Sequence, residues 1–283
     1  MAANGISTLA TKELRQVAKL DLAAIKRGGS YDITQLPTQY SGNTIVDNPN
    51  IGGLLQGRPW AITPFSNPTQ TTGSAVSVVA LSPFTGGGNS YQFSSSTNSY
   101  LSFPASTDWA MGNGDFTVEW FSRQTTLAQF QRVFTVGDYP AIDFGVSIES
   151  GTFYFWSGGD SDTDYSSASA TTTNTWYHWA VVRTGTTLSV YRDGTLRGSA
   201  VSNTDNINDS STPFIVGNTN TFATNAAFVG QITNFRLVKG LAVYTGNFTV
   251  PTSALTATAS ANPYGGSNTQ AISSGVTKLL LVP

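Results

Sequence analysis

Residues 176–199 read WYHWAVVRTGTTLSVYRDGTLRGS and hold two of the six tryptophans and the only histidine. Tyr177, Trp179 and Val181 fall on one face of a predicted strand, and the residues between them fall on the other. A short turn leads to a return strand, and the Asp-Gly pair at 193–194 is a strong signal for a two-residue hairpin. The segment therefore predicts an antiparallel meander rather than a loop that displays catalytic groups.

The same period of two continues through the chain from about residue 91. DFTVEWF at 115–121 and AIDFGVSIES at 141–150 both alternate apolar with polar residues, and turns rich in Gly and Asn separate such stretches. Short alternating strands predict an all-β fold, an antiparallel sandwich of two sheets. The apolar faces expected to line its core are Phe116, Val118 and Trp120, then Ile142, Phe144 and Val146, with Ile148 on the same face as the last three.

The N-terminal part of the chain has a different pattern. Good helix formers with a period near 3.6 predict a helix over 8–27, although a frayed terminus is the alternative. Prolines and glycines interrupt 31–89, so this part is expected to be an extended arm. We divide the chain into a helix (1–30), the arm and a β domain (90–283). The apolar residues expected to contact partner subunits are Leu14, Val17, Ile25, Leu36, Tyr40 and Trp60.

The composition excludes several classes of protein. Charged residues are only 11% of the chain and the net charge is −2, so it lacks the positive field that nucleic acid binding usually needs. The absence of cysteine excludes disulfides and thiolate metal sites. No apolar run reaches the ~18 residues of a spanning helix, and charged residues stand where a signal peptide is apolar. We expect synthesis in a cytoplasm, without nucleic acid or membrane partners.

The meander at 176–199 resembles the central hairpins of laminin-G-like, concanavalin A-like jelly rolls, in which a Trp-x-His strand runs into a Tyr-x-Asp-Gly turn. The resemblance covers about residues 90–283 and implies two curved antiparallel sheets. Many extracellular members carry a disulfide near the C-terminus, which this chain lacks. The further stretches that carry the resemblance are YLSFPASTDWAMGNGDFTVEWFSR (100–123), FVGQITNFRLVKGLAVYTGNFTVP (228–251) and TKLLLV (277–282).

RLVKGLAVYTGNFTVP (236–251) resembles the branch of this family found in tailed-phage virion proteins. ANGISTLATKELRQ (3–16) and YDITQLPTQYSGNTIVDNPN (31–50) resemble the opening of marine tailed-phage structural proteins. The resemblance implies a virion protein, a capsid decoration or a head or tail appendage, made in the host cytoplasm and joined to other virion proteins through residues 1–89. A homo-oligomer, a trimer by analogy, is expected. The alternative is a carbohydrate-binding adhesin that recognises host surface glycans, and both roles are compatible.

Sugar binding would use an aromatic platform beside polar donors, and calcium would use an oxygen-rich loop. The candidate platform residues are Trp109, Tyr154, Trp156 and Tyr165, with core packing as the alternative. GGDSDTDYS at 158–166 places acidic residues at alternate positions, as at the start of a calcium loop, but a solvated hairpin tip also explains it. The candidate calcium ligands are Asp160, Asp162 and Asp164, with Asp205 and Asp209 weaker.

The sequence favours a protein without enzymatic activity. His178 lies on a predicted strand between two tryptophans, which suits a packed ring better than a proton shuttle. Jelly-roll glucanases carry Glu-x-Asp-x-x-Glu or a near variant, and this string is missing. Asp115 and Glu119 would be ~13 Å apart at strand rise, too far for a glycosidase pair. A pairing of Glu119 with Glu149 stays open.

Overall fold

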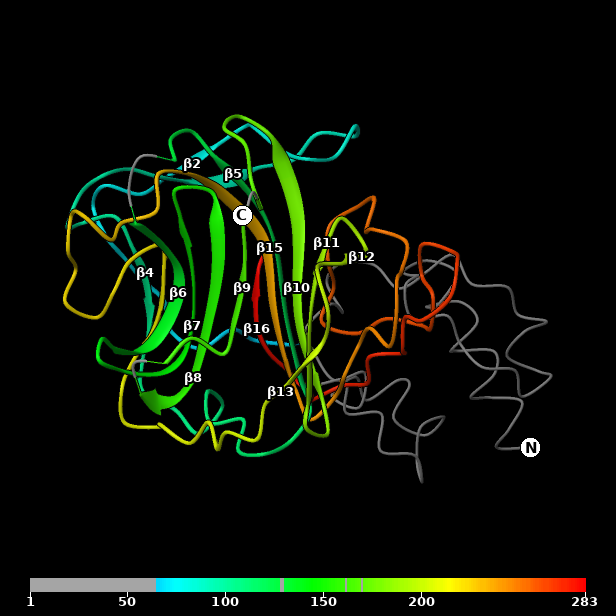
Figure 1. Cartoon of the computed structure of the whole chain (residues 1–283). Helices are drawn as coiled ribbons and strands as arrows, with labels where there is room; N and C mark the ends of the chain where they lie inside the picture. The colour runs from blue at the N-terminus through cyan, green and yellow to red at the C-terminus, as the bar shows by residue number, and fades with distance from the viewer. Residues whose placement is uncertain (1–64, 128–129, 161, 169) are drawn as a thin grey trace, which may run out of the picture. The chain divides into compact units, whose positions relative to one another are not determined.

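The computed structural model of the chain describes residues 65–283, apart from 128–129, 161 and 169. These residues form two antiparallel sheets and contain no helix, so the predicted all-β sandwich is confirmed. Figure 1 shows the sheets edge-on, with β6, β7 and β8 in one layer and β5, β10 and β15 in the other. No helix in this part of the chain has the length and apolarity needed to cross a bilayer.

The predicted helix over 8–27 and most of the predicted arm lie outside the described residues. The same holds for the apolar residues expected to contact partner subunits. They are Leu14, Val17, Ile25, Leu36, Tyr40 and Trp60.

One sheet has seven strands, in the order β1-β4-β14-β6-β7-β8-β9. Their bounds are Thr71–Thr72, Leu101–Phe103, Phe214–Val216, Phe130–Asp138, Ala141–Glu149, Thr152–Asp160 and Tyr165–Ser167. In the nine-stranded sheet the order is β12-β11-β10-β5-β15-β3-β2, with β13 beside β11 and β16 beside β15. The bounds in that order, then β13 and β16, are Thr195–Leu196, Thr187–Arg192, Trp176–Thr184, Phe116–Gln124, Gly230–Lys239, Ser90–Phe93, Ser77–Val79, Val201–Ser202 and Thr277–Leu281.

The β domain begins earlier than the predicted boundary at residue 90. Strand β1 pairs with β4, and β2 pairs with β3, so both belong to the sheets although they precede that boundary. The compact unit that contains them runs over Asn67–Pro283. Strands of two and three residues are too short to show a period of two, which is why the sequence pattern missed them.

The predicted meander is present as β10, β11 and the short β12. Asp193 and Gly194 both have positive φ, 51° and 74°, as a type I′ hairpin turn requires. A Cβ at Gly194 would collide with the carbonyl oxygen of Phe248, and the Phe248 amide donates to the Gly194 carbonyl at 2.9 Å. Gly194 is therefore needed both for the turn and for the close approach of the C-terminal segment.

The main core lies between the sheets and is rich in aromatic rings. Trp120 stacks on Phe153 across the sheets at 6.4 Å, and Phe134 meets Phe235 edge to face at 5.6 Å. The predicted core residues in this cluster are Phe116, Val118, Trp120, Phe144 and Val146, and Ile148, on the same face of β7, joins them. Ile142 is the exception: it is fully buried, but a bulge between Ile142 and Phe144 interrupts the pairing of β7 with β8, and it lies outside the main cluster.

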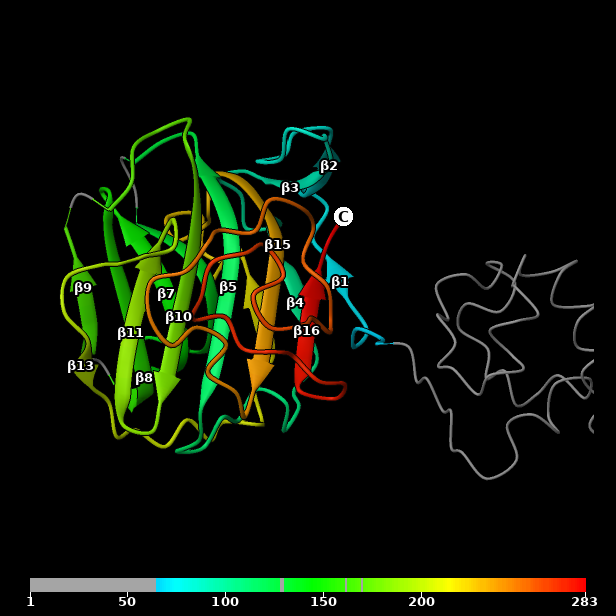
Figure 2. The same ribbon diagram turned by 90° about the vertical axis from the view of Figure 1, so that its right-hand side faces the viewer.

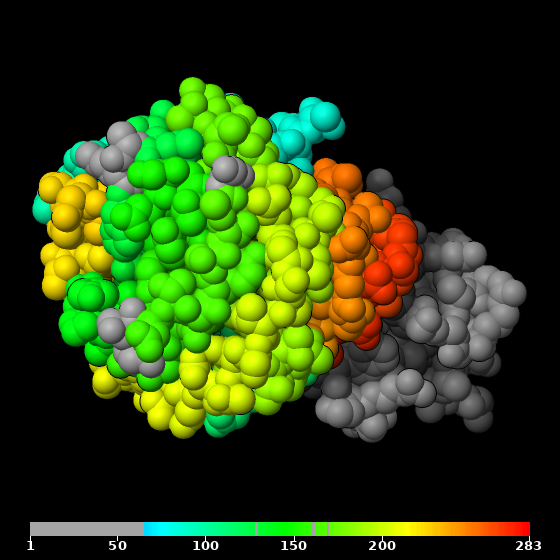
Figure 3. Space-filling model, viewed as in Figure 1, coloured from blue at the N-terminus to red at the C-terminus, as the bar shows by residue number. Residues whose placement is uncertain are grey.

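A second apolar cluster covers the outer face of the nine-stranded sheet. The C-terminal segment, orange to red in Figure 2, crosses in front of β5 and β10. In the space-filling view of Figure 3 it lies on the side away from the green strands β6–β8. The members of this second apolar cluster are Ala180, Val182, Tyr191, Val238, Ala242, Val243, Tyr244, Phe248 and Ile272. Strand β10 is therefore buried on both faces. The sequence alone did not predict that its second face, with His178, Ala180 and Val182, would be covered.

A buried carboxylate joins this covering segment to the sheet. Glu119 of β5 is fully buried and lies 3.1 Å from His178 Nε2, while the Tyr244 hydroxyl donates to it at 2.7 Å and Arg236 Nε at 2.9 Å. Burial by itself would raise the pKa of Glu119, but Arg236 and the hydrogen bonds from His178 and Tyr244 outweigh it and lower the pKa to about 2. The carboxylate is therefore ionised within the fold.

Replacing Glu119 by Gln should lower the free energy of unfolding by about 3–5 kcal/mol, because the buried Arg236 would lose its counter-charge. Urea unfolding at neutral pH measures this. The folded pKa of Glu119 is below the ordinary 4.5, so its stabilisation of the fold is present above pH 4.5 and is lost as the pH falls through 2. The difference in unfolding free energy between the native chain and Glu119→Gln should therefore narrow in acid.

Asp108→Asn is the matched control for this experiment. Asp108 is 42% exposed and pairs with Lys278 at 3.4 Å, so its loss should cost under about 1 kcal/mol. If Glu119→Gln costs no more than Asp108→Asn, the buried network does not hold the C-terminal segment.

Candidate functional site

The outer face of the seven-stranded sheet carries a strip of aromatic and polar side chains. Strand register places Arg132 of β6 opposite Ser147 of β7, and Ser147 opposite Tyr154 of β8. Phe130 and Trp156 stand two residues from Arg132 and Tyr154, so they point to the same side of the sheet. We call these residues the Arg132 strip; they are Phe130, Arg132, Ser147, Tyr154 and Trp156.

The guanidinium of Arg132 lies against two aromatic rings, Phe130 and Trp156, which meet edge to face with centroids 6.5 Å apart. Its central carbon is 4.7 Å from the centroid of the Phe130 ring and 4.7 Å from that of the Trp156 ring. Tyr154 stacks on Trp156 with centroids 5.6 Å apart and planes at 25°. Arg132 is 2% and Trp156 is 7% exposed, while Phe130 and Tyr154 are partly exposed. The contacts fix the orientation of the cation, since each such stack contributes about 0.5–2 kcal/mol.

Polar atoms at the centre of the strip have no hydrogen-bond partner. Nε and Nη1 of Arg132 and Oγ of Ser147 are buried and unpartnered within the described part of the chain. Burial lowers the pKa of Arg132 to about 10, against the opposing effect of Asp138 and Glu149, so the side chain stays protonated at neutral pH. Folded proteins rarely leave buried donors unpaired, because each costs about 1–3 kcal/mol, so this cluster is the strongest sign of a binding site.

The structure separates the aromatic residues predicted to bind sugar. Tyr154 and Trp156 lie in the Arg132 strip. Trp109 is fully buried, and its Nε1 donates to the Pro104 carbonyl at 2.8 Å. Tyr165 is 6% exposed and its hydroxyl donates to the Arg197 carbonyl. The prediction of a platform at Trp109 and Tyr165 is therefore corrected: both rings fill the main core, because their strand and loop turn them inward.

The sequence did not identify Arg132 or Ser147. In the segment FQRVF, the arginine follows a glutamine and precedes an apolar pair, a pattern equally typical of an exposed position. A bulge between Arg132 and Phe134 shifts the register, so simple alternation does not place both residues correctly. The only available signal was the density of aromatic residues on neighbouring strands.

Two carboxylates meet at one rim of the sandwich. Ser157 Oγ lies 3.0 Å from Asp164 and 2.7 Å from Asp205, and Asn203 Nδ2 donates to the same carboxylates at 3.2 and 2.9 Å. Arg183 donates to Asn203 Oδ1 at 3.0 Å and to the Asp205 carbonyl at 2.8 Å. Burial, followed by the nearby Asp205, raises the pKa of Asp164 to about 7. The rim therefore holds a proton near neutral pH.

The structure describes only part of the predicted calcium site. Asp162 is exposed, and the side chain of Asp160 lies outside the described part of the structure. Asp164 meets Asp205 instead, while Asp209 bonds to Ser211 and Thr212 of its own loop. Within residues 65–283 as described, no group of three or more His, Cys, Asp or Glu side chains could hold a metal ion. Calcium binding stays a prediction.

The two carboxylates left open as a glycosidase pair, Glu119 and Glu149, lie on different sheets. His178 is 1% exposed and lies against Glu119, beneath the C-terminal segment. Glu149 is exposed at the end of β7, on the outer side of the other sheet. Because packed sheets lie about 10 Å apart and both carboxylates point outward, Glu119 and Glu149 are too far apart for a glycosidase pair.

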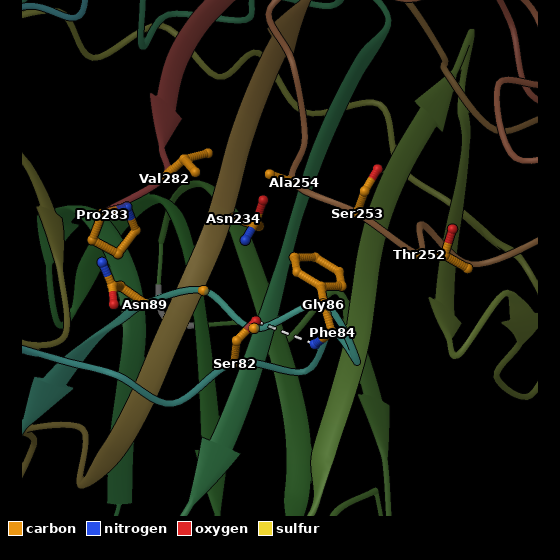
Figure 4. Close-up of a pocket in the computed structure, with 12 residues that line it drawn as sticks. Ser82, Phe84, Gly86, Asn89, Asn234, Thr252, Ser253, Ala254, Val282 and Pro283 are labelled. Atoms are coloured by element: carbon orange, nitrogen blue, oxygen red, sulfur yellow. Dashed lines mark hydrogen bonds between the residues drawn. The ribbon is translucent and has the colours of Figure 1, made fainter.

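A small hollow lies where the C-terminal strand meets the glycine-rich turn at 86–88 (Figure 4). Its volume is about 260 Å³, below the range of typical ligand pockets. Asn234, which lines it, already accepts from the Leu255 amide at 2.7 Å and donates to Thr233 at 3.1 Å. The Arg132 strip, with its unpartnered polar atoms, is therefore the stronger candidate.

Residues 93–242 match the family described as the concanavalin A-like lectin/glucanases superfamily, and this match covers more than half of the chain. The protein belongs to that superfamily, in agreement with the two-sheet fold and the hairpin motif. Comparison with curated protein sequences finds no match.

Three solved structures illustrate more distant similarity. Domain 4 of AbnA, an extracellular arabinanase from Geobacillus stearothermophilus solved with arabinotriose, is 17% identical with a TM-score of 0.47, over 61% of this chain and 83% of that one. The binding domain of Paraclostridial Mosquitocidal Protein 1 is 13% identical, with a TM-score of 0.43, over 60% of this chain and 42% of that one. Trypanosoma rangeli sialidase, solved with sialic acid, is 14% identical, with a TM-score of 0.46, over 61% and 27%. The chain spans less than half of the last two.

Replacing Asp164 by Asn should flatten the dependence of stability on pH. The folded pKa of Asp164 is about 7, raised from the ordinary 3.8. The stabilisation of the fold by protonated Asp164 is therefore complete below pH 3.8 and is lost as the pH rises through 7. Thermal unfolding between pH 4 and 8 should therefore show a fall in the melting temperature of the native chain that Asp164→Asn lacks. Asp162→Asn, at an exposed site, should retain the fall. Parallel curves for the native chain and Asp164→Asn would contradict the assignment.

Proposed function

We propose that the protein binds carbohydrate, and that the Arg132 strip on the outer face of the seven-stranded sheet is the binding site. The observation that carries the proposal is the group of buried, unpartnered polar atoms on Arg132 and Ser147, beside the Phe130 and Trp156 rings. Membership of a superfamily of lectins and glucanases agrees with this function.

Sugars match the chemistry of the strip. A sugar ring presents an apolar face of C–H groups, which packs on aromatic rings such as the partly exposed Phe130 and Tyr154. It also carries hydroxyl groups, which can satisfy donors and acceptors that the fold leaves unpaired. A purely apolar ligand would leave Arg132 and Ser147 unpartnered, so the strip favours a ligand with both characters.

Replacing Tyr154 by Ala should weaken sugar binding at least tenfold, about 1.4 kcal/mol, because the sugar would lose one of its exposed stacking surfaces. The full chain is first screened on a glycan array. Isothermal titration calorimetry with the best oligosaccharide then compares the native chain and the variant.

Tyr139→Ala is the matched control. Tyr139 is 69% exposed at the turn between β6 and β7, roughly 20 Å from Tyr154 along the strands, so its loss should leave binding unchanged. Equal sugar affinities for the native chain and Tyr154→Ala would exclude the Arg132 strip as the binding site. If the chain binds no glycan on the array, carbohydrate binding is excluded as the function. We propose binding without cleavage, so release of reducing sugar in the same samples would contradict that part.

A role in a tailed-phage virion is a separate proposal. It is supported by the resemblance of 3–16, 31–50 and 236–251 to virion proteins, and it includes virion partners, a homo-oligomer and a location on the particle. Leu36→Asp combined with Tyr40→Asp should reduce incorporation of the full chain into purified particles, since apolar docking contacts would be lost. Unchanged incorporation would contradict docking through the arm, and absence of the native chain from particles would exclude the role.

A further inference from the structure

Arg132 differs from the other deeply buried arginines of the described residues. Nε, Nη1 and Nη2 of Arg183 all donate to oxygen atoms of the chain. Arg236 donates through Nε and Nη2 to Glu119 and through Nη1 to the Thr256 carbonyl. Arg132 is just as buried, but Nε and Nη1 have no partner, and no described carboxylate forms an ion pair with it. Nε of the half-buried Arg197 is also unpartnered, but among the deeply buried arginines of the described residues only Arg132 has two guanidinium nitrogens without a partner.

The free atoms of Arg132 and Ser147 lie on neighbouring strands. The two residues are direct register partners, so their Cβ atoms are ~4.5–5.5 Å apart. Each keeps an unpartnered polar atom instead of bonding to the other. A ligand group that accepts hydrogen bonds would satisfy the unpartnered atoms of both side chains.

A carboxylate meets this requirement better than a neutral hydroxyl. It accepts hydrogen bonds on two oxygens, its planar shape matches the guanidinium, and charge-assisted bonds of this kind are about twice as strong as neutral ones. A ligand carboxylate would also form the ion pair that Arg132 lacks; Asp138 and Glu149 raise its pKa but do not pair with it. The Phe130 and Trp156 rings already hold the guanidinium in place, so little side-chain entropy would be lost on binding.

We propose that the ligand is an acidic sugar whose carboxylate accepts hydrogen bonds from Arg132 and the Ser147 hydroxyl while its ring packs on the exposed aromatic surface of the Arg132 strip. This inference rests on the proposed carbohydrate binding and specifies the class of sugar. Uronic and sialic acids both carry such a carboxylate, and the test distinguishes them.

Isothermal titration calorimetry with the full chain compares acidic sugars with neutral counterparts. Trigalacturonate is paired with galactotriose, and 3′-sialyllactose with lactose; a sulfated heparin disaccharide tests another anion. One carboxylated sugar should bind at least tenfold more tightly than its neutral counterpart, and the pair that shows this identifies uronate or sialate. Arg132→Lys should reduce the preference, since lysine keeps the charge but not the planar donor group.

Ser147→Ala keeps the test valid if Arg132→Lys fails to fold. It removes a hydroxyl that has no partner within the described chain, so the melting temperature should not fall, while affinity for the acidic sugar should drop about three- to tenfold. Arg192→Gln is the matched control: Arg192 also stacks on an aromatic ring, Tyr177 at 4.9 Å, but stands in the other sheet, and its loss should leave affinity unchanged.

The outcomes distinguish failure of the carboxylate preference from failure of carbohydrate binding itself. Equal affinity for acidic and neutral sugars, or a preference that survives both strip variants, would overturn the carboxylate assignment and leave carbohydrate binding intact. Tighter binding of the sulfated disaccharide than of either carboxylated sugar would also overturn it. If no sugar in the set or on the array binds, carbohydrate binding itself is wrong.

Discussion

The carboxylate of Glu119 accepts hydrogen bonds from side chains on elements far apart in the sequence. His178 comes from the neighbouring strand β10, Arg236 from β15 on the other side, and Tyr244 from the C-terminal segment. An ionised group inside a protein is stable only when its charge and lone pairs are matched, so these contacts have to form together. They fix the C-terminal segment against the sheet and give strand β10 its second buried face.

This covering makes the two outer faces of the sandwich unequal. The nine-stranded sheet is closed by the apolar cluster around Tyr244 and Phe248, so its outward side chains pack rather than bind. The seven-stranded sheet instead presents the Arg132 strip, with partly exposed rings and unpartnered polar atoms. The proposed sugar site therefore lies on the face opposite the segment that stabilises the fold.

Few residues are charged, at 11% of the chain, yet several of them are buried as connectors. Arg183 links the rim loops, and Arg236 links Glu119 to the C-terminal segment. A satisfied buried cation of this kind ties distant backbone segments together. Arg132 has the same burial without the same bonds, and this difference is the observation on which the proposed ligand rests.

The sequence by itself determined the all-β class, the meander of β10 to β12 and most of the core, because alternation and an Asp-Gly turn are local signals that survive in the fold. It placed Tyr154 and Trp156 among the sugar-binding candidates but grouped them with Trp109 and Tyr165, since periodicity does not tell which loop turns inward. Only the tertiary structure decided the pairing of Arg132 with Ser147, the meeting of Asp164 with Asp205 and the covering by the C-terminal segment. These depend on strand register, bulges and contacts between residues distant in the chain, and no local pattern encodes them.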